Sequence, residues 1–185
     1  MEIIFLVEQN MFRKDEKNKK AFVEVLVANS QSIARAMLDD GSIDENKYLE
    51  VLMEHLYLFL HIADRLAYSI ITEKRRVTLL PGIFDLSIRF AVETTCGHWP
   101  DDLKTNIYNE CINNLYSSFN EFAQYKSFLG ETEIGPKNTL LWEFCKNIAR
   151  IRGEENNVGS IIGHGWVVGI ALKNIEIRSH LEELK

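Results

Sequence analysis

Residues 48–76 read YLEVLMEHLYLFLHIADRLAYSIITEKRR, and this stretch decides the fold. When its side chains are placed every 100° around an α-helix, most polar ones fall within one arc of roughly 100°. Nearly all the others are apolar, and His55 is the main polar exception on the far side. A surface helix has a narrower apolar face than this. The pattern therefore predicts a long, mostly buried central helix that neighbours surround on about three sides.

The polar arc of this central helix is the first candidate site. We select six of its residues as candidate ligand-binding residues: Glu54, Tyr57, His61, Asp64, Arg65 and Tyr68. His61 and Asp64 lie one helical turn apart, so the carboxylate can fix the tautomer of the imidazole. Arg65 offers a clamp for an anion. In an enzyme of this design, His61 would be the base or ligand and Asp64 the residue that orients it.

Two interpretations of the polar arc stay open. It either meets water, with ion pairs inside the helix, or lines a groove for a ligand, a metal or a partner. A pair such as His61 and Asp64 supplies at most two metal ligands, whereas a zinc site usually needs three or four. Glu93, His98 or His164 would have to supply the others, and nothing in their spacing requires it. We therefore predict no metal site and name no cofactor.

Local signals place the central helix between two boundaries. Residues 3–7 are a short apolar run that fits either a strand or a helical turn. The charged run 13–20 then leads into a helix of about 20 residues. Ser42 and Glu45 have the spacing of a capping box, which predicts that the central helix begins there. Its predicted end is at about Arg76, where basic side chains oppose the negative end of the helix dipole.

Pro81 and Gly82 predict a break in the chain. Residues 84–92 then alternate between apolar and polar side chains as a strand does. The same stretch also fits a helix, because Asp85 and Arg89 have the four-residue spacing of a helical ion pair. We favour the helix because no partner strand is evident.

The rest of the chain adds further helices. Pro100 and two acidic residues begin one that continues to about Tyr125, and a shorter helix covers 141–151. Few prolines and glycines argue against a turn-rich β protein. The predicted fold is therefore all-α: a single domain, 1–185, built as a bundle of five to six helices.

The glycine-rich start of the last segment is the second candidate site. Gly159 and Gly163, and Gly165 and Gly169, have G-x-x-x-G spacing, but the two pairs fall on different helix faces. Glycine allows close approach of backbones. We therefore predict tight packing of a buried final helix against the central one. His164 lies between two of these glycines, where a structural role is more common than a ligand role.

Charge and composition exclude several classes of function. The net charge is −6 and the isoelectric point is near 5.4, which gives no electrostatic footprint for nucleic acid. The start of the chain lacks the pattern of a signal peptide, and no apolar run reaches the roughly 18 residues of a membrane span. We expect a cytoplasmic protein that binds neither nucleic acid nor membrane.

The cysteines give little sign of covalent chemistry. The chain has 3 of them, without C-x-x-C spacing, which is typical of a reducing compartment. Cys96 lies near His98 in sequence, but a catalytic pair is normally assembled from distant segments. Cys111 and Cys145 lie on apolar helix faces, where an inert thiol is expected.

Two functions fit these observations. The first is a non-enzymatic cytoplasmic protein that acts through protein association, as a homodimer. It rests on two stretches, the central helix and 158–172, which are apolar nearly all round and which a small bundle covers only with effort. The partner is a second copy or another protein. Trp99, Trp142 and Trp166 belong either to the core or to an exposed anchor patch. The second is a helical protein, possibly an enzyme, that binds a small molecule or a metal along the polar arc. The sequence leaves enzymatic activity open.

Overall fold

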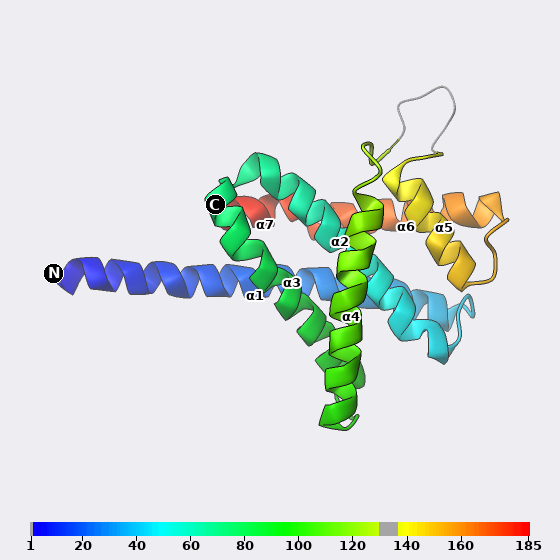
Figure 1. Ribbon diagram of the computed structural model, residues 1–185, viewed down its shortest axis with the longest axis horizontal. Coiled ribbons are helices and arrows are strands. Elements are labelled where there is room, and N and C mark those ends of the chain that lie inside the picture. The colour runs from blue at the N-terminus through cyan, green and yellow to red at the C-terminus, as the bar shows by residue number, and fades with distance from the viewer. Residues whose placement is uncertain (1, 130–136) are drawn as a thin grey trace.

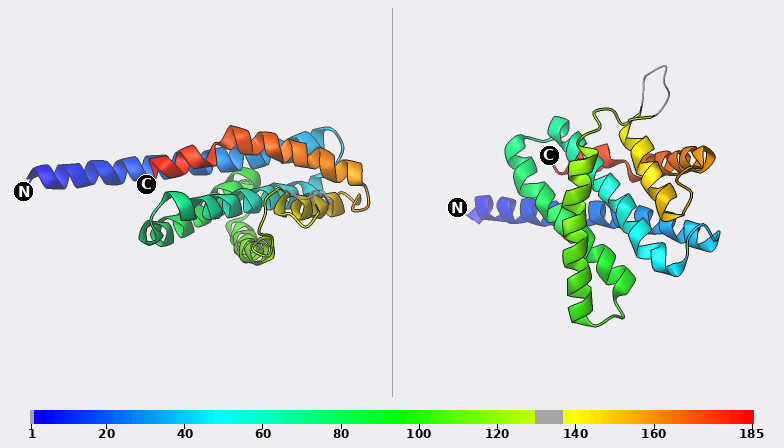
Figure 2. Two further views of the ribbon diagram at one scale, coloured as in Figure 1. Left: turned by 90° about the horizontal axis from the view of Figure 1, so that it is seen from above. Right: turned by 45° about the vertical axis from the view of Figure 1, so that its right-hand side comes forward.

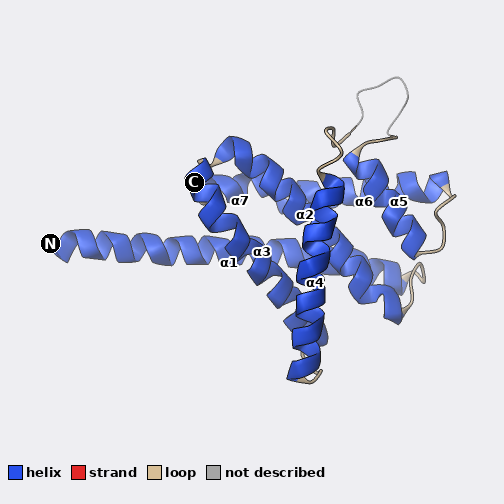
Figure 3. Ribbon diagram, viewed as in Figure 1, coloured by secondary structure: helices blue, strands red, loops and turns tan. Residues whose placement is uncertain are grey.

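The computed structural model describes residues 2–129 and 137–185, with side chains from residue 14 onward (Figure 1). The described residues form seven helical segments: α1 (Glu2–Asp39), α2 (Glu45–Ile70), α3 (Glu73–Cys96), α4 (Asp101–Phe122), α5 (Leu140–Ile151), α6 (Val158–Ile175) and α7 (Ile177–Glu183). Only Glu176, in the left-handed conformation with φ of 49°, separates α6 from α7. Counted as one bent helix, these two complete a bundle of six, and the predicted all-α fold is confirmed. Figure 3 shows no strand in the described parts of the chain.

Helix α2 lies at the centre of the bundle, as predicted. It contacts α1, α3, α4, α5 and α7. All residues from His55 to His61 are buried. Figure 2 shows α1 beside α6 and α7 in one layer, α2, α3 and α5 in a second, and α4 on the outer side of the second layer. A helix that is apolar on most sides is thereby covered on most sides.

The start of α2 differs from the prediction. Asp44, not Ser42, caps the helix, and its carboxylate accepts a hydrogen bond from the Lys47 amide at 3.2 Å. The prediction that Ser42 and Glu45 form a capping box was therefore wrong. The reason lies in the preceding turn, where the buried Ile43 still bonds through its amide to the carbonyl of Met37 at 3.1 Å. The chain can enter the next helix only after this turn is complete.

The end of α2 also differs. The helix ends at Ile70 instead of continuing to Arg76, and Thr72 caps a new helix by accepting a hydrogen bond from the Arg75 amide at 3.3 Å. The basic residues therefore lie in the first turn of α3 and do not oppose the α2 dipole. Arg75 pairs with Asp15 of α1 at 2.5 Å instead.

Helix α3 contains the residues that were expected to interrupt it. Pro81 lies inside the helix, so the predicted break was wrong. Pro81 and Val77 both lie on the exposed side, where water can satisfy the carbonyl that a proline leaves unpaired. Residues 84–92 are helical, which confirms the favoured alternative, and Asp85 pairs with Arg89 at 3.3 Å.

The two ends of the chain also depart from expectation. The apolar run 3–7 is helical, one of the two alternatives left open, but it is continuous with the following helix and forms the start of the 38-residue α1. Helix α6 packs between α1 and α5 and was predicted to be buried against α2. It buries only one face, formed by Ile161, His164, Val168, Ala171 and Ile175. The opposite face is exposed, so the prediction of a fully buried final helix was wrong.

Candidate functional site

Helix α4 covers the middle of the polar arc. The hydroxyl of Tyr57 donates a hydrogen bond to the carbonyl of Cys111 at 3.0 Å. The ring of His61 lies against Phe119 and Phe122, with ring centroids 5.1 Å and 5.4 Å away. The side chain of His61 is 5% exposed. This part of the arc neither meets bulk water nor lines a groove.

The remaining part of the arc joins α2 to its neighbours. Asp64 pairs with Arg76 of α3 at 3.0 Å, and the guanidinium of Arg76 lies 5.6 Å from the centre of the Tyr68 ring. Arg65 donates a hydrogen bond to the carbonyl of Tyr125, just beyond α4. These side chains form structural links between helices. The Arg65 guanidinium, which was suggested to bind an anion, instead bonds to the backbone carbonyl of Tyr125.

The expected hydrogen bond between His61 and Asp64 is not formed. Both ring nitrogens of His61 are buried without a partner. Burial, and the nearby positive charge of Arg65, lower the pKa of His61 to about 4, so the ring is neutral at pH 7. A buried imidazole without hydrogen bonds destabilises the fold, because its nitrogens have lost their bonds to water.

We predict that His61→Leu stabilises the protein by about 1–2 kcal/mol, because leucine has a similar volume and no polar atom to desolvate. Urea denaturation at pH 7 measures the effect. The matched control is His98→Leu, at an exposed histidine, and its effect should lie within about 0.5 kcal/mol of zero. A large loss of stability in His61→Leu would show that the ring has a partner that matters.

Glu54 is the one residue of the arc whose pKa lies near neutral pH. Partial burial and the carboxylates of Glu121 and Glu50 raise its pKa to about 7. Glu121 in turn accepts a hydrogen bond from Asn147 of α5 at 3.2 Å. Glu54 has no hydrogen bond or ion pair with the other residues of the polar arc. The structure therefore does not bring the six candidate residues together around one space.

Sequence reasoning missed a pair of buried histidines, His55 of α2 and His164 of α6. Their Nε2 atoms lie 2.9 Å apart, and His55 Nδ1 lies 2.7 Å from the carbonyl of Val51. Because a carbonyl only accepts, His55 Nδ1 carries the proton, and His164 Nε2 donates to His55 Nε2. The available signal was the isolated polar position of His55 on the apolar side of α2.

The surroundings keep this histidine pair neutral. The ring of Phe144 packs edge-on against His55 at 5.2 Å between centroids. Burial lowers the pKa of His55 to about 4. Burial, the adjacent His55 ring and the positive charge of Arg152 lower the pKa of His164 to about 3. Among the described residues, no third His, Cys, Asp or Glu joins the pair to form a metal site. The pair is a polar link between two helices.

Cys111 and Cys145 are buried as expected, and Cys96 is buried as well. Cys96, Cys111 and Cys145 are all free, and burial raises the pKa of Cys145 to about 12. A thiol of such high pKa is a poor nucleophile at pH 7.

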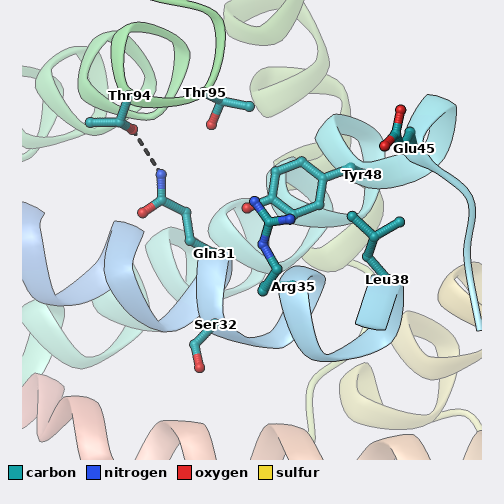
Figure 4. A pocket seen from close by; sticks show the side chains of 8 residues that line it. All are labelled: Gln31, Ser32, Arg35, Leu38, Glu45, Tyr48, Thr94 and Thr95. Carbon is teal, nitrogen blue, oxygen red and sulfur yellow. Dashed lines mark hydrogen bonds between the residues drawn. The ribbon is translucent and has the colours of Figure 1, made fainter. Parts of the chain in front are cut away.

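A polar pocket lies away from the polar arc, between α1, α2 and α3 (Figure 4). Its volume is about 570 Å³. The guanidinium of Arg35 stacks over Tyr48, 5.1 Å from the ring centre, and Gln31 donates a hydrogen bond to Thr94 at 2.8 Å. Arg35 is exposed, and Glu45 also lines the pocket, so charges of both signs face it. This arrangement selects no particular ligand.

The exposed face of α6 is apolar and borders a groove against α5. Trp166 is 73% exposed, Ile170 is 61% exposed and Ile162 is 48% exposed. The groove, with a volume of about 470 Å³, is also lined by Leu141 and Trp142 of α5. We call the surface formed by Ile162, Trp166 and Ile170 the α6 face. It is the clearest unpartnered apolar surface that the described residues present.

By length and composition alone, the stretch Val158–Glu183 could cross a membrane. A mostly buried core helix of a soluble protein passes the same test, but only 28% of the apolar window here is buried. Two features of this stretch weigh against a span: α6 buries one face against α1 and α5, and Glu176 interrupts the helix with a left-handed residue.

Comparisons of this chain with protein-family models, with curated proteins and with solved structures find no match.

Proposed function

We propose that this protein is non-enzymatic and acts through protein association, as a homodimer, with the α6 face as its interface. The observation that carries the proposal is the exposure of Trp166 between Ile162 and Ile170, at four-residue spacing along one side of a helix. Contiguous apolar surface of this kind is typical of sites of association. Tryptophan is also the residue type that most often dominates the energy of an interface.

Charge favours a protein partner over a membrane. The net charge of −6 opposes binding to anionic lipids. A second copy of the chain offers an apolar surface of matching chemistry. The three buried free cysteines fit a reducing, cytoplasmic compartment.

A ligand-binding function along the polar arc has less support. Most of the arc is engaged with α3 and α4, and no described pocket is lined by His61 or Asp64. Association through α6 does not require the arc to open.

We predict that Trp166→Asp converts a dimer into a monomer. Removing an anchoring tryptophan typically costs at least 2 kcal/mol, and a two-fold interface contains it twice, so the dissociation constant should rise about a thousandfold. Light scattering and sedimentation velocity across a concentration series measure the change. The control is Tyr116→Asp, at a 56% exposed aromatic residue on α4, which should leave the dimer unchanged.

A wild-type protein that stays monomeric at all concentrations would refute the homodimer. If that monomer also sedimented with neutral phosphatidylcholine vesicles, and Trp166→Asp did not, the α6 face would be a membrane-binding surface instead. If Tyr116→Asp and Trp166→Asp both gave monomers, the assignment of the interface to α6 would be wrong.

A further inference from the structure

We infer that two copies pair their α6 helices antiparallel about a two-fold axis, with Trp166 and Ile170 of one copy lying on Gly163 and Gly159 of the other, and Lys173 meeting Glu155. This inference rests on the proposed function and defines its geometry. Three features of the described residues support it: the size of side chains along the α6 face, the charges at its two ends, and the direction of the helix dipole.

Side-chain size changes along the exposed side of α6. At 100° per residue, Gly159, Gly163, Trp166 and Ile170 fall within an arc of about 60°. Within this arc the two glycines precede Trp166 and Ile170 along the helix, and the exposed Ile162 lies outside the arc, about 40° from Trp166. A Cβ added at Gly163 would meet nothing within 4 Å, so the backbone there is open to close approach. This surface has a shallow half and a raised half.

Only the antiparallel arrangement places the raised half on the shallow half. If the axis passes between His164 and Gly165, Trp166 faces Gly163 of the second copy and Ile170 faces Gly159. In a parallel pair, Trp166 of one chain would meet Trp166 of the other, and the glycines of the two chains would face each other across a gap. Packing of large against small side chains is what gives interfaces their shape complementarity.

The same axis pairs opposite charges. Lys173 lies near the end of α6 and Glu155 lies in the turn just before its start, so the antiparallel arrangement brings them to the same end of the interface. Both Lys173 and Glu155 are exposed, and within the described parts of the chain neither has an ion-pair partner, whereas the neighbouring Glu154 is already paired with Arg152 at 3.0 Å. A parallel pair would bring like charges together. Antiparallel helices also place opposite dipole ends side by side.

This geometry makes a closed dimer. Each contact occurs twice, because a two-fold interface uses the same patch on both copies. The α6 face of each copy is then covered by the other copy, so assembly through this face stops at two.

Charge reversal tests the pairing. Lys173→Glu alone and Glu155→Lys alone should each weaken association about tenfold, because two ion pairs are lost and two repulsions gained. The double variant should return the dissociation constant to within about threefold of wild type. Lys74→Glu, at an exposed lysine on α3, controls for the change in net charge. A double variant as weak as the sum of the singles would refute the pairing of Lys173 with Glu155.

Cross-linking tests the direction of the helices independently of charge. Chains carrying Gly159→Cys and chains carrying Ile170→Cys are distinguished by a size tag, mixed, and oxidised. The three native cysteines are buried, so the parent chain is a silent control. Antiparallel pairing should cross-link the mixture into a heterodimer, while neither variant cross-links alone. A side chain at Gly159 comes within 3.3 Å of Asn157 Oδ1, so circular dichroism checks that each variant is folded.

The outcomes separate the inference from the proposed function. If each variant cross-links with itself, the helices are parallel, and the inferred geometry is wrong while the dimer stands. If wild type is dimeric, Trp166→Asp is monomeric and no folded variant cross-links, the antiparallel register is again refuted. A monomeric wild type refutes both.

Discussion

The free energy of unfolding should fall steeply as the pH drops from about 6.5 towards 4. His55, His61 and His164 have pKa values lowered by burial to about 4, about 4 and about 3, whereas histidine in an unfolded chain titrates near 6.5. Between these values the unfolded chain binds protons that the folded chain excludes. Each such group reduces stability by up to about 1.4 kcal/mol per pH unit, so three give up to about 4 kcal/mol per unit.

Glu54 works in the opposite direction. Its pKa is raised to about 7 from 4.5, so between these values the folded chain binds the extra proton and gains stability as the pH falls. This offsets the contribution of one histidine, and the net loss should be near 3 kcal/mol per pH unit or less. Urea denaturation at half-unit steps from pH 7.5 to pH 4.5 measures it.

His61→Leu serves as the matched comparison in this titration. It removes one of the three buried histidines and should reduce the slope of stability against pH by roughly a third of the histidine contribution. His98→Leu, at an exposed position, is the control for replacing a histidine with leucine. A stability that stays flat from pH 6.5 to pH 4.5 would contradict the burial of neutral histidines in the folded protein.

Replacing either member of the histidine pair alone should cost about 2–3 kcal/mol, because the partner keeps a buried ring nitrogen without a hydrogen bond. His164→Leu leaves His55 Nε2 without its donor, and His55→Leu leaves His164 Nε2 without its acceptor. The double variant removes both polar groups, so it should lose about 1–2 kcal/mol less than the sum of the two single losses. Chemical denaturation of the four proteins measures this coupling.

The choice of leucine keeps the volume near that of histidine, which limits the contribution of an empty cavity. His98→Leu combined with His55→Leu provides an uncoupled pair, whose losses should add. If the losses of His55→Leu and His164→Leu also add, the contact of 2.9 Å between their Nε2 atoms contributes no coupling energy.

Sequence patterns predicted the helices best where the signal was local and repeated. The apolar surround of α2 and the helical spacing of Asp85 and Arg89 both described what the structure contains. The end of α2 was predicted wrongly because Ile70 and Ile71 continue the apolar pattern without interruption. Thr72 can occupy a helix interior or a cap, and only the packing of α3 beside α2 selects the cap.

The candidate site depended on contacts that a sequence does not display. His61 and Asp64 have the right spacing for a hydrogen bond, but the turn into α3 brings Arg76 to Asp64, and α4 brings two phenylalanines to His61. His55 and His164 are 109 residues apart in sequence. Neither residue alone predicts the other, because their contact arises from the packing of α6 between α1 and α5.

The polar side chains of α2 have a consequence for how the native state is selected. A helix that is apolar on most sides can pack almost equally well after a rotation or a one-turn slide, because hydrophobic contact is not directional. Three interactions form in one orientation only: the hydrogen bond from Tyr57 to the Cys111 carbonyl, the hydrogen bond from Arg65 to the Tyr125 carbonyl, and the contact between His55 and His164. Misaligned packings would leave these groups desolvated and unpaired. These polar side chains of α2 thus set the register of the bundle, and they discriminate against near-native alternatives that apolar burial alone would tolerate.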